Sequence, residues 1–268
     1  MQWFRVANSA HGVETGEAAT PEVFADTEDR LWMLVDDGVR RARDVALAAS
    51  RVSMRFGPTW ALHDAGITVQ PGEVVAVVGA SGSGKSTFLH CIAGLLAPTS
   101  GSILFGGTEM TTASDAERTT IRRERFGFVM QHGRLIPEMT LAQNAAIPLR
   151  LLGVPKSAAL ARVAPLMKRL GVSHLADRLP GEVSGGEQQR VAVVRALVAQ
   201  PMIVFADEPT GALDSANGAA VASALFDIAR ELDSAVVIVT HDDSLASAAD
   251  RVVTMADGRT SQPRAWPR

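Results

Sequence analysis

Short runs of apolar residues recur between residues 45 and 260. Three of these runs contain almost no polar positions, which is typical of parallel strands that are buried on both faces of a sheet. They occupy residues 74–78, 202–206 and 235–240. Two longer strand-like stretches, 47–56 and 61–69, come before the first run, and a shorter one at 251–255 predicts an outer strand. The pattern predicts an α/β domain with a mostly parallel sheet.

Helical spacing replaces this pattern in two places. A helix is predicted for residues 85–93, because Gly94 and then Pro98 supply stop signals. Residues 137–180 are poor in strand signals and have helical spacing, for example at 159–170. The α/β core is therefore expected to be interrupted by a helical insertion, at about residues 132–183.

The first 44 residues differ from the rest, with five basic and nine acidic side chains. Their first half lacks periodicity and is predicted to be flexible. A short helix capped by Thr27 is predicted for the second half, with an apolar face expected to pack against the main domain. That face consists of Leu31, Val35, Val39 and Ala42. The chain is thus divided into an extension (1–44), one domain (45–260) and a tail (261–268).

Composition narrows the class of protein. The chain has 268 residues, 47% of them hydrophobic and 21% charged, as in ordinary globular proteins. A net charge of −3 gives no reason to expect a nucleic-acid partner. The single cysteine, Cys91, cannot form an internal disulfide and is expected to be buried. No apolar run approaches the roughly 18 residues needed to cross a bilayer, so a cytosolic location is expected.

A phosphate-binding loop follows the strand predicted at 74–78. The pattern G-x-x-x-x-G-K-[ST] is matched by Gly79, Ala80, Ser81, Gly82, Ser83, Gly84, Lys85 and Ser86. Its glycines let successive backbone N–H groups and a helix N-terminus face an anion. Lys85 can reach the β- and γ-phosphates, and Ser86, followed by Thr87, can bind Mg²⁺. The loop lies between a strand and a helix, as the motif requires, and predicts a nucleoside triphosphate site.

The second half of such a site follows the strand at 202–206. Asp207 ends this strand, where a carboxylate can hold Mg²⁺ or its waters. Glu208 follows directly and can act as a general base on the attacking water.

A third segment resembles the signature of the ATP-binding-cassette ATPases. It consists of Val183, Ser184, Gly185, Gly186 and Glu187, followed by Gln188, Gln189 and Arg190. The resemblance implies a P-loop NTPase fold with a RecA-like core, an antiparallel β subdomain and an α-helical subdomain. It also implies ATP hydrolysis with Mg²⁺, and a second copy of the chain whose signature closes over the ATP bound by the first.

Other family landmarks follow in order. Gln131 resembles the glutamine that contacts Mg²⁺ and water, and His241 the histidine that contacts the γ-phosphate. Gly211-Ala212-Leu213-Asp214 resembles the family's D-loop. Phe56 matches the aromatic residue that stacks on adenine, with Trp60 as a nearby competitor. Two departures are Val183 in place of leucine and Gln143 in place of glutamate.

Residues 208–214 and 135–141 together resemble the ATPases of lipoprotein release, macrolide export and cell division. This implies a motor at the cytoplasmic face of the membrane, held there by a separate integral-membrane permease. Amino-acid importers share much of the pattern and remain an alternative. A soluble cassette ATPase of DNA repair or translation is disfavoured by the short insertion, the single P-loop and the single cysteine.

Overall fold

The computed structural model describes residues 45–131, 133–211, 213 and 215–261. The extension predicted at 1–44, with its short helix, and nearly all of the predicted tail lie outside these residues. Ala212 and Asp214 of the D-loop segment do so as well.

The main sheet has six strands in the order β10-β9-β3-β8-β7-β6. Their bounds are β10 (Arg259–Thr260), β9 (Arg251–Ala256), β3 (Val74–Val78), β8 (Ala235–Thr240), β7 (Ile203–Asp207) and β6 (Phe126–Val129). All neighbouring pairs are parallel except β10 with β9. The predicted buried strands β3, β7 and β8 lie in the middle of the sheet. The strand expected at its outer edge, β9, is second from that edge because β10 pairs outside it.

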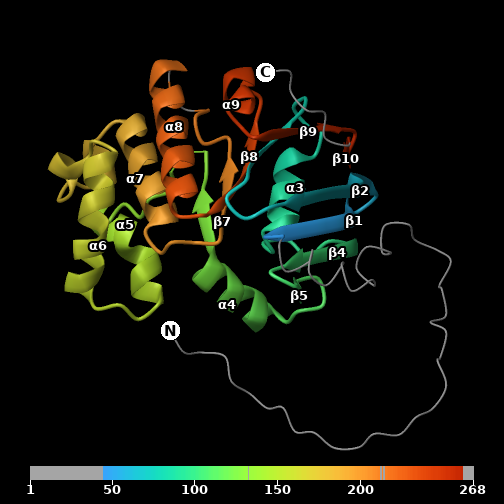
Figure 1. Ribbon diagram of the computed structural model, residues 1–268, viewed down its shortest axis with the longest axis horizontal. Helices are drawn as coiled ribbons and strands as arrows, with labels where there is room; N and C mark the ends of the chain where they lie inside the picture. Colours follow the sequence, from blue (N-terminus) through green and yellow to red (C-terminus); the bar gives the residue numbers. More distant parts are fainter. Residues whose placement is uncertain (1–44, 132, 212, 214, 262–268) are drawn as a thin grey trace, which may run out of the picture.

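A second, antiparallel sheet has the order β2-β1-β4-β5. Its strands are β1 (Leu47–Phe56), β2 (Thr59–Val69), β4 (Ser100–Phe105) and β5 (Thr108–Glu109). Helix α3 (Lys85–Ile92) lies between this sheet and the main sheet (Figure 1). One hydrophobic cluster joins all three and contains Cys91, which is buried as predicted. Burial raises the pKa of the Cys91 thiol to about 12.

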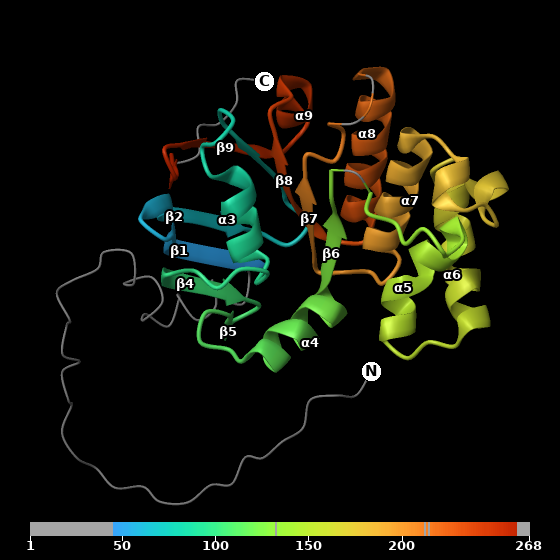
Figure 2. The same ribbon diagram turned by 180° about the vertical axis from the view of Figure 1, so that it is seen from behind.

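The opposite face of the main sheet is covered by helices (Figure 2). Helices α7 (Gly185–Leu197), α8 (Ser215–Glu231) and α9 (Asp243–Ser247) pack on the strands, while α5 (Leu141–Leu151) and α6 (Lys156–Arg169) pack on α7, farther from the sheet. Two 3-10 turns, Ser173–Leu175 and Pro180–Glu182, lie between α6 and α7, and α4 (Asp115–Arg125) leads into β6. Successive residues of β3 point to opposite faces of the sheet. Val74 and Ala76 belong to a hydrophobic cluster on the side of these helices, whereas Val75 and Val77 belong to the cluster around α3. Helices α5 and α6 lie within the insertion predicted at about residues 132–183, and α7 begins just after it.

Candidate active site

The phosphate-binding loop runs from the end of β3 into the N-terminus of α3. Gly84 precedes the helix with φ +101° and makes no side-chain cap, so the first amides of α3 remain available. A Cβ atom at Gly84 would lie 2.6 Å from the carbonyl oxygen of Ala61 in β2. Only glycine allows the loop to approach the β1–β2 hairpin this closely, so this contact holds the helix N-terminus beside that hairpin.

The loop wraps around its own lysine. Lys85 is only 8% exposed, and its Nζ donates hydrogen bonds to the carbonyl oxygens of Gly79 at 2.8 Å and Ala80 at 2.9 Å. The ammonium is therefore held at the centre of the loop, where the backbone amides and the helix dipole also favour an anion.

Asp207 at the end of β7 meets two side chains of α3. Ser86 Oγ donates to Asp207 Oδ1 at 3.0 Å, and His90 Nε2 lies 3.8 Å from Asp207 Oδ2. His90 was not identified from the sequence, although its spacing of four residues from Ser86 places both on one face of the helix. The arrangement gathers hydroxyl, carboxylate and imidazole groups at the carboxyl edge of the parallel sheet.

Glu208 and His241 form a pair at the same edge. His241 Nδ1 lies 2.8 Å from Glu208 Oε1. The hydrogen bond to Glu208 and then its negative charge raise the pKa of His241 above its usual value. The ion pair is therefore complete below this raised pKa and is lost as the pH rises through it. Glu208 has φ +45°, a left-handed backbone conformation that residues other than glycine rarely adopt. Its N–H donates to the carbonyl oxygen of Val239 in β8 at 2.9 Å.

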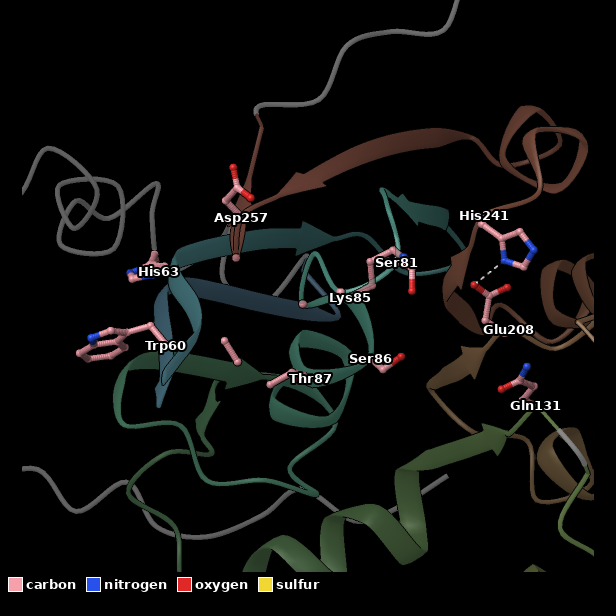
Figure 3. A pocket seen from close by; sticks show the side chains of 14 residues that line it. Trp60, His63, Ser81, Lys85, Ser86, Thr87, Gln131, Glu208, His241 and Asp257 are labelled. Carbon is pink, nitrogen blue, oxygen red and sulfur yellow. Dashed lines mark hydrogen bonds and ion pairs between the residues drawn. The ribbon is translucent and has the colours of Figure 1, made fainter. Parts of the chain in front are cut away.

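Most of these groups line one cleft of about 670 Å³ (Figure 3), although Asp207 and His90 do not line it. Sequence-predicted residues that line it are Ser81, Gly82, Gly84, Lys85, Ser86, Thr87, Gln131, Glu208 and His241. Residues without a predicted role also line it, namely Ala61, His63, Asp257 and Gly258. Trp60 lines the cleft, whereas the half-exposed Phe56 does not. The chain thus brings distant motifs from both sheets to one opening.

The signature segment is positioned elsewhere, at the N-terminus of α7. Ser184 caps the helix in a reciprocal box with Glu187: its N–H and its hydroxyl both donate to Glu187 Oε2 at 2.8 Å. These bonds hold the pKa of Glu187 below its usual value. None of the signature residues 184–187 lines the cleft of their own chain.

A strand–loop–helix anion site, with Asp207 and Glu208 at the end of one parallel strand and His241 at the end of its neighbour, defines a P-loop nucleoside triphosphatase. Residues 62–211 match the family model described as "ABC transporter". The chain belongs to the ABC transporter family. It is an ATP-binding and ATP-hydrolysing subunit that powers a membrane transporter.

The relatives agree with this assignment. The lipoprotein-releasing system ATP-binding protein LolD of Shewanella denitrificans is 44% identical over 204 residues, which cover 76% of this chain and 88% of that protein. LolD 1 of Rhodospirillum rubrum is 44% identical over 198 residues, which cover 74% of this chain and 88% of that protein. The dimeric ATP-binding cassette MJ0796, bound to ADP and Pi, superposes with a TM-score of 0.75 at 33% identity, covering 83% of this chain and 99% of that one. Among the described residues of the present chain, no helix is both long enough and apolar enough to span a membrane.

Proposed function

We propose that this chain drives a separate integral-membrane subunit of the lipoprotein-releasing type from the cytoplasmic face of the membrane. The observation that carries the ATPase part of the proposal is the single cleft shared by the phosphate loop, Gln131, Glu208 and His241. The similarity to two lipoprotein-releasing ATP-binding proteins supports the type of transporter. An amino-acid importer remains the second candidate, because its ATPases share much of the same sequence pattern.

The proposed roles of the nucleotide-binding residues follow from their contacts. Lys85 and the amides of residues 79–87 bind the phosphates, since they converge on the N-terminus of α3. Ser86 and Asp207 hold Mg²⁺, and their 3.0 Å contact brings together the hydroxyl and carboxylate oxygens that this ion prefers. When bound, Mg²⁺ neutralises charge that develops on the phosphate oxygens.

Hydrolysis needs a base and groups that orient water and the terminal phosphate. Glu208 is proposed as the base, with His241 holding its carboxylate from the neighbouring strand end. Gln131, which enters the cleft from the end of β6, orients the water and the metal site. The signature residues 184–187 are proposed to act on the ATP of a second copy, in keeping with their absence from the lining of their own cleft and with the dimeric cassettes that resemble this chain.

We propose Trp60, rather than Phe56, as the residue that stacks on adenine. In the β1–β2 hairpin Arg55 pairs with Trp60 and Phe56 with Thr59, so Phe56 and Trp60 project from opposite faces. Arg55 lies over the Trp60 ring, 5.7 Å from its centre, and Trp60 is on the face that lines the cleft.

We therefore expect Trp60→Ala to weaken ATP binding about tenfold through loss of stacking. Phe56→Ala should change it much less, although the family resemblance alone would favour Phe56. The dissociation constant for ATP, measured on both variants, decides between them. A larger loss for Phe56→Ala would assign the stacking to Phe56.

The surface proposed to receive the membrane subunit is the loop at residues 136–140. Asn144 is fully buried and holds this loop, accepting from the Ile136 amide at 2.6 Å and donating to the Ile136, Met139 and Thr140 carbonyls. Thr140 is the N-cap residue of α5, and its N–H donates to the side chain of Gln143 while its hydroxyl accepts from the Gln143 N–H. The glutamine found in place of glutamate therefore still completes the helix cap. The loop is thus rigid and presents Ile136 and Met139, 40% and 37% exposed, to a partner.

Met139→Asp and Glu138→Lys are expected to abolish recovery of the membrane subunit and its stimulation of ATPase activity. Both side chains are exposed and neither lines the cleft, so the ATPase activity of the isolated chain should be unchanged. Lys168→Glu on the exposed side of α6 is the matched control. Full partner-stimulated activity in the first two variants would contradict the proposed surface.

Co-purification from native membranes tests the proposal as a whole. A membrane protein recovered with the chain, whose lipoprotein release requires ATP, is the expected result. Recovery of an amino-acid permease would favour the importer, and recovery of nucleic acid without a membrane protein would reject both.

A further inference from the structure

The segment that carries Gln131 is held by side chains of the helix that begins at the signature. The segment turns sharply after β6: Met130 O accepts from the Gly133 amide at 3.1 Å. It also accepts from Gln189 Nε2 of α7 at 3.1 Å. Gln189 is only 2% exposed, so this amide group is committed to the contact rather than to solvent.

A second side chain of α7 holds the other end of the turn. Gly133 and Arg134 have φ of +65° and +46°, and their carbonyl oxygens accept from the Arg195 guanidinium at 2.5 Å and 2.9 Å. Burial lowers the pKa of Arg195. Among the described residues no carboxylate lies within ion-pair distance of Arg195. The cost of burying this charge is therefore offset mainly by the two carbonyl contacts.

Gln131 lies between these two attachment points. Its backbone is held by the hydrogen bonds at Met130 and Gly133 on either side of it. Its side chain lies against the turn after Glu208, because a Cβ atom at Gly211 would be 3.2 Å from Gln131 Nε2. A shift of α7 must therefore move Gln131 relative to the cleft, because packed elements transmit displacement through such direct contacts.

We propose that Gln189 and Arg195 are positioning residues that fasten the Gln131 segment to α7, so that Gln131 and the signature at Ser184 move as one unit. The inference rests on the role proposed above for Gln131. Loss of either donor should leave ATP binding by the phosphate loop intact but misplace Gln131 for hydrolysis.

The test compares Arg195→Met and Gln189→Met, which keep much of the side-chain volume but remove the donors, with Arg195→Lys, which keeps the charge. Arg150→Met is the matched control, since Arg150 also donates to a backbone carbonyl, that of Val154, at 2.5 Å, but outside this segment. Full-length chains are assayed for kcat, for KM, for ATP affinity without Mg²⁺ and for thermal unfolding.

We expect kcat to fall about tenfold or more in Arg195→Met and Gln189→Met, with ATP affinity unchanged within about twofold. Arg195→Lys should recover part of the loss, and Arg150→Met should resemble the parent. Combining Arg195→Met with Gln131→Ala should give a kcat within about twofold of Gln131→Ala alone, because both act through the same side chain.

Multiplicative losses in the double variant, or a parent-like kcat in folded Arg195→Met and Gln189→Met, would overturn the inference. If Gln131→Ala itself has parent-like kcat, the role proposed for Gln131 fails first. Should Arg195→Met not fold, Gln189→Met in the same double-variant comparison decides the outcome.

Discussion

Lys85→Ala is expected to abolish or severely weaken ATP binding and to reduce hydrolysis by at least about a hundredfold. The substitution removes the one ammonium group that the loop encloses, and with it a charge aimed at the transferred phosphoryl group. Isothermal titration with ATP and a phosphate-release assay measure the two effects.

Lys156→Ala is the matched control, because Lys156 is also the first residue of a helix but is exposed on α6. Thermal unfolding of Lys85→Ala must accompany the assays, since the Gly79 and Ala80 carbonyls lose their donor. Near-parent ATPase activity in folded Lys85→Ala would reject the site.

Glu208→Gln is expected to lower hydrolysis about a hundredfold or more while ATP still binds, because the amide has nearly the same shape but cannot accept the proton. ATP-bound copies should then persist as a dimer in size-exclusion chromatography. The pKa of His241 should also fall back toward its usual value, since Glu208 is the main cause of its elevation. Proton NMR of His241 measures this independently of catalysis.

Glu124→Gln, on the exposed face of α4, is the control and should match the parent. A Glu208→Gln protein that stays monomeric with ATP at high concentration would count against the proposed dimer. An unchanged His241 pKa would mean that the Glu208–His241 contact does not form in solution.

The sequence was sufficient to predict those elements whose pattern lies within one short segment of the chain. Strands β3, β7 and β8 are buried except for the last residue of β3 and of β7, and near-continuous apolar runs are the direct consequence of that burial. The phosphate loop could be identified because its chemistry requires glycines, a lysine and a hydroxyl at fixed spacing. By contrast, β4 begins Ser-Gly-Ser and β5 has two residues, so neither carries enough periodicity to be predicted.

Contacts between distant segments were decided only by the tertiary structure. The approach of His90 to Asp207 depends on how α3 lies over β7, and the presence of Trp60 rather than Phe56 in the cleft lining depends on hairpin register. The attachment of Gln189 and Arg195 to the Gln131 turn joins side chains to carbonyls about sixty residues away. Carbonyl oxygens leave no signal in a sequence, because every residue has one. The motifs alone thus determined the class of protein, while packing determined how its parts are joined.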